Sequence, residues 1–470
     1  MKVEIKNITI KKIASILKNT NYDKHVYVVG GFVRDLLMGN EPDDIDLLIE
    51  GNINAGIEFA EWFCKTNGIY EKDVNPIVYG LYGTAMFQFH GEKIECVAPR
   101  SEKYKENSRN PEVTSCTIVE DCFRRDFTIN SMFINISTGE LFDYSGNGLK
   151  DLHKGIIRST SDPETIFNQD SLRMLRAIRF ASRFDFAIEA KTYAAIVKLH
   201  DRLSIITKER ILAEVNKMML CKYPHEAILQ LQETGLLHYV LPELENTCGR
   251  EVKDGKGHKD IFMHSLQVLH NVALESDSLY LRWAALLHDI GKPKVKQFKD
   301  GNWTFENHAD VGAKMIDGIF KKITMPLDER MQYVKTLIRL HMRPMQLCED
   351  GVTDAAIRRL LVEAGDYIDD LLILCNADIT SSHKDKVEKF QNNYVYLKKR
   401  MIELEESDRL RNFQPPVDGN EIMEMFNLQP CKTVGVLKEK VKDAILDGII
   451  PNEHDAAKAY VIEEFNKLNK

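Results

Sequence analysis

The fold is decided by a stretch near the N-terminus, VVGGFVRDLLMGNEPDDIDLLIEG, residues 28–51. An apolar, β-branched run over residues 25–30 ends in two glycines, and the pattern that follows is that of a short helix. A strand that enters a helix through glycines brings backbone N–H groups and a helix N-terminus to one point, which suits a phosphate group. Arg34 adds a cation whose planar fork can bind phosphate oxygens.

Two carboxylates stand a few residues further on. Asp44 and Asp46 are two apart on a predicted strand, so their side chains share one face while Ile45 points into the core. Carboxylate oxygens at that separation can hold a hard divalent cation such as Mg²⁺. Two such ions would clamp the attacking and leaving oxygens of a phosphoryl displacement. The stretch therefore predicts magnesium-dependent chemistry on a phosphate.

The length, composition and net charge of the chain limit the class of protein. A chain of 470 residues, 44% hydrophobic and 29% charged, predicts several globular domains. It has neither a long apolar run nor an apolar signal-peptide core at its start, so we expect no membrane span and a cytoplasmic location. The nine cysteines form no CxxC pair, which is typical of a reduced protein. The net charge of −8 argues against bulk attraction to nucleic acid but leaves a local basic track possible.

The chain changes character along its length. Residues 1–148 mix strand-like and helical runs, with a hairpin expected over 83–100 and a polar loop over 101–113. From about residue 167 onward, apolar residues recur at three- and four-residue intervals, and no further strands are expected. The predicted fold class is α+β: a head with a mixed sheet and helices, followed by an all-helical body.

The opening motif, Gly30-Gly31-x-Val33-Arg34-Asp35 followed by Asp44-Ile45-Asp46, resembles that of the class II tRNA nucleotidyltransferase and bacterial poly(A) polymerase family. The resemblance implies a polymerase-β-like head in which Asp44 and Asp46 are catalytic and hold Mg²⁺, while Gly31 and Arg34 contact the nucleotide. RRDFTINSM, residues 124–132, resembles the second signature of the family. It implies that Arg125 touches the incoming nucleotide, that Asp126 touches its ribose, and that Asn130 braces the turn.

DSLRMLRAIRF, residues 170–180, carries an arginine face. On a helix, a roughly 120° arc holds four arginines: Arg173, Arg176, Arg179 and Arg183. Because no acids are interleaved with them, we expect a triphosphate or RNA as their partner. The resemblance implies that Asp170 and Arg173 read the base and that Arg176 and Arg179 extend the basic track. Gln169 departs from the family, which often has Glu there.

A second set of chemistry-bearing side chains lies in the helical body. Imidazoles and carboxylates together form a ligand set for divalent transition metals. Their order along the chain resembles the HD domain of many family members, which implies a second metal and phosphoester hydrolysis. The ligands so implied are His264, His288, Asp289 and Asp378, with His308 and His341 nearby.

The resemblance also implies a domain order and a function. It places a catalytic head at 1–148, a helical neck at 149–240, an HD domain at 241–390 and a helical tail at 391–470. The implied activity is template-free addition of the 3′-terminal CCA to tRNA from CTP and ATP. Alternatives are a poly(A) polymerase, an enzyme that adds only A or only CC, and an RNA-binding protein with an HD phosphohydrolase. A third catalytic carboxylate at Glu95 and the oligomeric state stay open.

Overall fold

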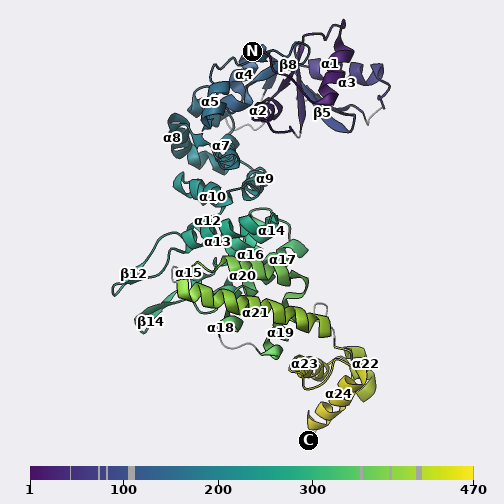
Figure 1. Cartoon of the computed structure of the whole chain (residues 1–470), viewed down its shortest axis with the longest axis vertical. Coiled ribbons are helices and arrows are strands. Elements are labelled where there is room, and N and C mark those ends of the chain that lie inside the picture. The colour runs from purple at the N-terminus through teal and green to yellow at the C-terminus, as the bar shows by residue number, and fades with distance from the viewer. Residues whose placement is uncertain are drawn as a thin grey trace. The chain divides into compact units, whose positions relative to one another are not determined.

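A computed structural model gives the fold and describes residues 1–42, 44–71, 75–80, 83–103, 112–349, 353–380, 384–408 and 415–468. These residues form two compact units, Met1–Cys221 with Glu226–Val240, and Lys222–His225 with Leu241–Lys470. The first unit carries a large sheet and the second is mainly helical, which confirms the predicted α+β class (Figure 1). The four domain boundaries stay a prediction. Among the described residues, no helix has both the length and the hydrophobicity needed to cross a bilayer.

The sheet of the first unit has seven strands in the order β3-β4-β5-β2-β1-β8-β9. Its centre is built by the opening stretch, because β1 pairs antiparallel with β2, and β2 pairs parallel with β5. All four residues of β1 are buried, as expected for a strand with neighbours on both sides. The strands are β1 Val26–Val29, β2 Ile45–Ile49, β3 Ile77–Tyr79, β4 Thr84–Phe89, β5 Glu92–Val97, β8 Phe133–Asn135 and β9 Leu141–Phe142.

Helices surround this sheet and continue beyond it. The α3 helix packs against β2, β4 and β5. The helices around the sheet are α1 Ile8–Leu17, α2 Gly31–Leu37, α3 Ala55–Thr66, α4 Ile118–Arg124, the 3-10 turn η2 Thr128–Asn130 and α5 Gly148–Lys154. Further elements of the unit are β10 Ile156–Ile157, α6 Pro163–Gln169, α7 Leu172–Phe184, β11 Ala187–Ile188, α8 Ala190–Leu199, η3 His200–Ile205, α9 Lys208–Met219, most of α10 Pro224–Glu233, and α11 Leu237–Val240.

The second unit is a set of packed helices. Those near its centre are α12 Pro242–Glu245, α13 Ile261–Glu275, α14 Leu279–Leu287, α15 Lys292–Val295, α16 His308–Lys322, α17 Glu329–Leu340 and α20 Ile368–Ala377. The others are α18 Arg343–Glu349, α19 Asp354–Ala364, η4 Gly365–Tyr367, α21 Lys384–Asp408, α22 Gly419–Phe426, α23 Lys432–Leu446 and α24 His454–Leu468. The helices α16 and α17 pack closely on each other, as do α13 and α14.

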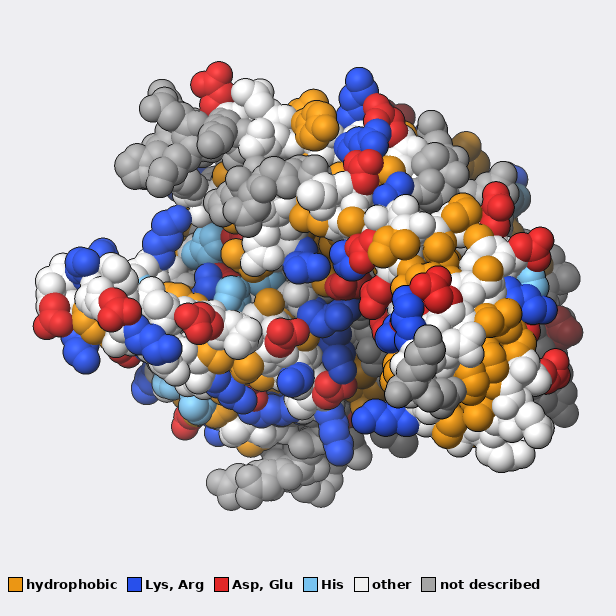
Figure 2. All heavy atoms as spheres, turned by 90° about the horizontal axis from the view of Figure 1, so that it is seen from below, with side chains coloured by type: hydrophobic (Ala, Val, Ile, Leu, Met, Phe, Trp, Pro, Cys, Tyr) orange, Lys and Arg blue, Asp and Glu red, His pale blue; other side chains and the backbone are white. Residues whose placement is uncertain are grey.

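Two hairpins interrupt this helical unit, so the expectation of no strands after residue 167 was wrong there, as it was at β11 in the first unit. The two hairpins are β12 Val252–Lys253 with β13 Lys256–Gly257, and β14 Gln297–Lys299 with β15 Asn302–Thr304. Each turns on an Asp-Gly pair with two positive φ angles, 53° and 74° in the first and 48° and 71° in the second. Asp-Gly favours this mirror-image turn. Figure 2 shows the resulting arm at the left, with acidic and basic side chains side by side.

The prediction of a polar loop over residues 101–113 was also wrong, at both ends of that segment. β6 Arg100–Lys103 and β7 Glu112–Ser115 pair antiparallel, so both ends of that segment are strands. The part between them, residues 104–111, lies outside the described residues. The expected hairpin over 83–100 is confirmed, since β4 and β5 pair and the turn falls at His90 and Gly91.

Candidate functional site

A cleft of about 910 Å³ opens in the first unit. It is lined by the glycine turn before α2, the two aspartates of the opening stretch and one face of α7. Of the described residues, nine arginines and four aspartates line it, although the whole chain carries a net charge of −8. The local basic track that the net charge left possible is therefore present in this cleft. A concave site rich in arginine suits a polyanion such as a nucleoside triphosphate.

The paired carboxylates lie on one wall of the cleft. Asp44 precedes β2 and is exposed, Asp46 lies in β2, and Ile45 between them is 2% exposed. Both carboxylates line the cleft while Ile45 packs inward, as the alternation predicts. Asp46 is paired in register with Glu95 of β5. Glu95 is absent from the cleft lining among the described residues, so the structure gives it no direct place in the site.

Asp46 has an unusual proton affinity. Burial, helped by the nearby charges of Glu95 and Asp44, raises the pKa of Asp46 to about 6, although Arg125 opposes the shift. Crowded carboxylates of this kind repel one another unless a cation or a proton intervenes. Their oxygen donors and their mutual repulsion fit a hard divalent ion, so the residues present suit the magnesium that the sequence predicts.

The glycine turn lies beside both charged groups. Gly30 adopts a φ of 67°, in the left-handed region that glycine tolerates best. A Cβ placed there would lie 3.6 Å from Asp46 Oδ2 and 3.6 Å from Arg125 Nη1. Gly31 begins α2 and also lines the cleft. The turn therefore lies against both the Asp46 carboxylate and the Arg125 guanidinium.

The Arg34 side chain is more deeply buried and more fully hydrogen-bonded than the sequence indicates. Its Nε and Nη2 donate to the two carboxylate oxygens of Asp35 at 2.8 and 2.7 Å, and its Nη1 donates to Asn130 Oδ1 at 2.7 Å. The residue is 4% exposed, and its guanidinium lies 4.7 Å from the centre of the Phe184 ring. Asp35 balances the charge of Arg34. Arg34 therefore lines the cleft as part of a buried network that includes Asn130.

Asp121 is a site residue that the sequence reasoning missed. This fully buried carboxylate accepts from Arg124 through Oδ1, at 2.9 and 2.6 Å, and from Arg125 Nε through Oδ2, at 2.9 Å. One acid thus fixes both arginines of the RRDF motif at the cleft wall. Its positions three and four residues before the arginines on α4 are the spacing that lets helical side chains meet, so the pattern was visible in the sequence.

Asp126 and Asn130 connect the head to the arginine helix. Asp126 Oδ1 accepts from Asn130 Nδ2 at 3.1 Å, and Oδ2 accepts from Arg176 Nε and Nη2 at 2.9 and 2.6 Å. Burial disfavours the charged form of Asp126, but Arg176 and Asn130 outweigh it and lower its pKa to about 2. Asn130, for which the resemblance implies a bracing role, bonds to both Arg34 and Asp126.

Two arginines on the face of α7 pair with acidic side chains. Arg179 Nε lies 2.7 Å from Glu214 Oε2 of α9, and Arg176 pairs with Asp126. The lack of acids interleaved with the four arginines did not predict these two pairs, because the acids come from other segments, which a helical projection of one segment cannot show. Arg183 is exposed and lines the cleft.

The predicted base-reading pair lies at the junction of α6 and α7. Asp170 Oδ2 is 2.8 Å from Arg210 Nη2, and Arg173 Nη1 donates to Gln169 Oε1 at 3.2 Å. All four of these residues line the cleft. Gln169, which stands where the family often has Glu, thus orients Arg173 through a hydrogen bond to a neutral acceptor.

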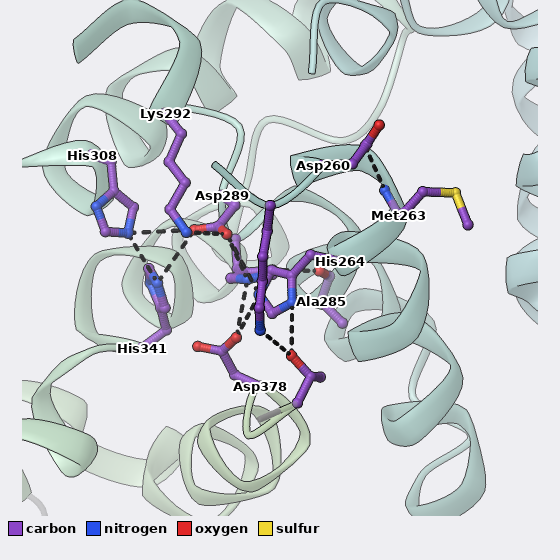
Figure 3. Close-up of polar contacts among 12 residues, drawn as sticks. Asp260, Met263, His264, Ala285, Asp289, Lys292, His308, His341 and Asp378 are labelled. Carbon is purple, nitrogen blue, oxygen red and sulfur yellow. Dashed lines mark hydrogen bonds and ion pairs between the residues drawn. The ribbon is translucent and has the colours of Figure 1, made fainter. Parts of the chain in front are cut away.

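The second unit contains a cluster of imidazoles and carboxylates, and Figure 3 shows its labelled side chains converging from several helices. His264 Nε2 is 2.8 Å from Asp378 Oδ1, and His288 Nε2 is 3.3 Å from Asp289 Oδ2. His288, His341 and Asp378 directly follow the C-terminal ends of α14, α17 and α20, where the helix dipole favours a cation. The structure thus brings together all four predicted ligands and both nearby histidines.

The buried donors and acceptors of this cluster fit a metal ion. His288 Nδ1 lies 2.8 Å from the Ala285 carbonyl oxygen, so its Nε2 is turned toward the carboxylates. Among the described residues, His288 Nε2 and Asp289 Oδ1 are buried without a hydrogen-bond partner. In metal-binding histidines, one ring nitrogen typically donates to a carbonyl oxygen in this way, which leaves the other nitrogen directed at the metal. The sequence reasoning missed Lys292, whose Nζ lies 2.5 Å from Asp289 Oδ2, although HDxxK is a plain i, i+3 acid–base spacing.

Comparison with known proteins gives three family matches. Residues 26–158 match the poly A polymerase head domain, residues 185–248 match the probable RNA and SrmB-binding site of polymerase A, and residues 261–382 match the HD domain. The HD match contains the whole imidazole and carboxylate cluster, and the head match contains Asp44, Asp46 and Arg125.

Individual proteins are similar over most of the chain. The mitochondrial CCA tRNA nucleotidyltransferase of Saccharomyces cerevisiae is 27% identical over 88% of this chain and 83% of its own. The A-adding tRNA nucleotidyltransferase of Deinococcus radiodurans is 30% identical over 72% of this chain and 77% of its own. The crystal structure of the Bacillus stearothermophilus CCA-adding enzyme in complex with CTP has the same fold, with a TM-score of 0.68, 20% identity and 98% of each chain covered.

Proposed function

Because the chain belongs to the tRNA nucleotidyltransferase family, and is therefore a nucleotidyltransferase, we propose that it builds or repairs the 3′-terminal CCA of tRNA from CTP and ATP. The observation that carries this proposal is the meeting of Asp44 and Asp46 with the glycine turn in a cleft that nine arginines of the described part of the chain line. Such a cleft suits a triphosphate and an RNA end. The paired carboxylates suit a divalent ion that would lie between the RNA 3′-hydroxyl and the triphosphate.

Members of this family depend on a divalent metal, and we propose Mg²⁺ held by the carboxylate oxygens of Asp44 and Asp46. When bound, the ion supplies positive charge that lowers the pKa of the RNA 3′-hydroxyl and stabilises the α-phosphate. Arg125 would bind phosphate and ribose groups from the opposite side of the glycine turn. Asp121 keeps that guanidinium in place without removing it from the cleft.

Base choice is assigned to Asp170 and Arg173. A carboxylate accepts from the exocyclic amine that C and A both carry, and an arginine donates to ring nitrogens or carbonyl oxygens. U lacks that amine at the equivalent edge, which supports selection of C and A by these two side chains. Arg176 and Arg179 would hold the geometry of α7 through their carboxylate partners, with Arg176 fixing Asp126 near the ribose. The tRNA itself would be recognised by shape, as is usual for structured RNA.

An extension assay tests this proposal against its closest alternatives. Purified protein receives tRNA transcripts that end before CCA, after C and after CC, with each labelled nucleotide alone and with both together. The proposal expects C, C and then A, each added only to the matching transcript. Addition of A alone, to the CC-ended transcript only, would make this an A-adding enzyme, and long A tracts would make it a poly(A) polymerase. The cytoplasmic location stays a prediction.

A second activity is supported by the second unit. The buried, unsatisfied His288 Nε2 and Asp289 Oδ1 favour a divalent transition metal held by the four predicted ligands, which are His264, His288, Asp289 and Asp378. A metal site of this kind suits hydrolysis of a phosphoester. Asp46→Ala should abolish nucleotide addition while leaving hydrolysis of a 2′,3′-cyclic phosphate intact. Loss of both activities in that variant would contradict two separate sites.

A further inference from the structure

We infer that the Ile205 side chain is an apolar platform against which the base of the incoming nucleotide stacks. This inference rests on the proposed function and deepens it, because Asp170 and Arg173 are assigned only to the edge of the base. Hydrogen bonds at the edge leave the flat face of the ring to be covered. That face is weakly hydrated, so contact with an apolar side chain stabilises the bound base.

Among the described residues, Ile205 is the one exposed apolar side chain in the lining of the cleft. It is 50% exposed, although glycines and polar or charged side chains make up most of that lining. The other apolar residues of the lining are 9% exposed or less, and they are Leu172, Phe180 and Ile206. A half-exposed isoleucine at the wall of a polar cleft offers apolar area that a bound molecule removes from water.

The segment that carries Ile205 is tied to the segment that carries the base-reading pair. Before Ile205 in the chain, Arg202 Nη2 donates to the Asn168 carbonyl oxygen at 3.4 Å. After it, Arg210 Nη2 lies 2.8 Å from Asp170 Oδ2. Both contacts reach the C-terminal end of α6, so the turn between them lies beside the junction of α6 and α7. Ile205 is therefore close to the place where the edge of the base is read.

The local backbone holds Ile205 in a fixed position. Ile205 ends the 3-10 turn η3, and the Ile206 N–H donates to the Leu203 carbonyl oxygen at 3.1 Å. The Leu203 and Ile206 side chains are buried, so the turn is anchored on both sides of the exposed Ile205. A β-branched side chain also has few χ1 rotamers. The platform therefore loses little conformational freedom when a base covers it.

Contact with the face of a base has a different consequence from hydrogen bonding to its edge. C, A and U all present a flat face, so the platform strengthens the binding of each nucleotide without choosing among them. Asp170 and Arg173, in contrast, are assigned to the separation of C and A from U. Ile205 is therefore a residue for affinity, and its loss should leave base discrimination unchanged.

Equilibrium dialysis of CTP and ATP against the full-length chain, with magnesium and without tRNA, tests the inference. Ile205→Ala should raise the Kd for both nucleotides about 3- to 10-fold, because it removes apolar contact area, and Ile205→Leu should restore most of the affinity. The matched control is Leu220→Ala. Leu220 follows α9 and is also 50% exposed, but it is absent from the cleft lining among the described residues, so this variant should bind like wild type. Inorganic triphosphate, which has no base, should displace CTP equally well from wild type and from Leu220→Ala, and its own Kd should be unchanged in Ile205→Ala.

The outcomes separate the platform from the proposed function. A wild-type chain that binds neither nucleotide and extends no tRNA would overturn both. Normal binding by wild type with unchanged Kd values in Ile205→Ala would overturn the platform alone. So would an equal loss of affinity for inorganic triphosphate, which would show a general distortion of the cleft.

Addition to tRNA gives a second readout. The ratio of UTP to CTP incorporation should be the same in Ile205→Ala and wild type, and a higher ratio would assign Ile205 to the edge of the base instead. A rise confined to the KM for CC-ended tRNA would assign Ile205 to the RNA end, and it would likewise contradict the inference.

Discussion

The Asp126 carboxylate accepts two hydrogen bonds from the Arg176 guanidinium, at 2.9 Å from Nε and 2.6 Å from Nη2. Asp126 follows α4, which packs beside the sheet, whereas Arg176 lies in α7. The pair therefore sets the distance between the wall of the cleft that carries the RRDF motif and the wall that carries the arginines. Because Asp126 also accepts from Asn130, which accepts from Arg34, one chain of bonds runs across the site.

Arg176→Ala should break this chain and destabilise the first unit. Asp126 would remain buried without its strongest partner, which costs about 3 kcal/mol, at the lower end for a broken buried pair because the Arg176 side chain keeps 33% exposure. Urea unfolding measures the loss. Arg183→Ala, an exposed arginine on the same helix, is the control and should change stability by less than about 1 kcal/mol. Equal losses in both variants would contradict the role of the pair.

Asp46→Asn should abolish nucleotide addition and yet stabilise the protein in the absence of divalent metal. The pKa of Asp46 is raised to about 6, so the folded state binds its proton more tightly than the unfolded state does. Stability therefore falls as pH rises from about 4 to about 6, and the deficit stays constant above that range. Asn cannot ionise and escapes the deficit.

The expected gain from Asp46→Asn is largest at about pH 7.5 and vanishes near about pH 4. Its upper limit is about 3 kcal/mol, at about 1.4 kcal/mol per pKa unit, and the partial exposure of Asp46 reduces it. Thermal unfolding across this pH range, in chelator, measures the difference from the wild-type chain. A variant that is less stable than wild type at neutral pH would show that the carboxylate is not strained.

Arg173→Ala should weaken base discrimination more than it weakens binding of the triphosphate. Hydrogen bonds from a charged donor are worth roughly 1.5–3 kcal/mol, so kcat/KM for CTP and ATP should fall by about 10- to 100-fold. Misincorporation of UTP relative to CTP should rise, as single-nucleotide competition assays would show. A uniform fall for all nucleotides would assign Arg173 to phosphate binding instead.

Gly56→Ala should destabilise the protein although alanine favours helices. A Cβ at Gly56 of α3 would lie 2.8 Å from the Cys96 carbonyl oxygen and 3.0 Å from that of Gly83. Backbone atoms cannot move aside cheaply, so we expect a loss of about 1–3 kcal/mol. In Gly318→Ala the added Cβ meets no described atom within 4 Å, and the helix should gain about 0.5–1 kcal/mol. Urea unfolding of both variants measures the two changes in stability, which should have opposite signs although the substitution is the same.

Much of the site could be predicted because its signals are local. Asp44 and Asp46 lie two apart beside a buried Ile45, and period-two alternation alone places both carboxylates on one face. The resemblance to the HD domain likewise implied a cluster, and among the described residues six side chains form it.

The remaining features depend on partners far away in the chain. Arg34 pairs with its sequence neighbour Asp35, but its bond to Asn130 joins residues far apart in the chain. Only the packing of α7 brings Arg176 to Asp126. The carboxylate that pairs with Arg179 comes from α9. The hairpins at Asp254-Gly255 and Asp300-Gly301 were not predicted, although an Asp-Gly pair favours the mirror-image turn of a short hairpin.

The most direct test of the central claim is a crystal structure of the full-length chain with magnesium and CTP. The account predicts a divalent ion held between Asp44 and Asp46, with the triphosphate beside Gly31 and within reach of Arg125. Two carboxylates turned away from each other, with the nucleotide bound elsewhere or without an ion between them, would contradict it.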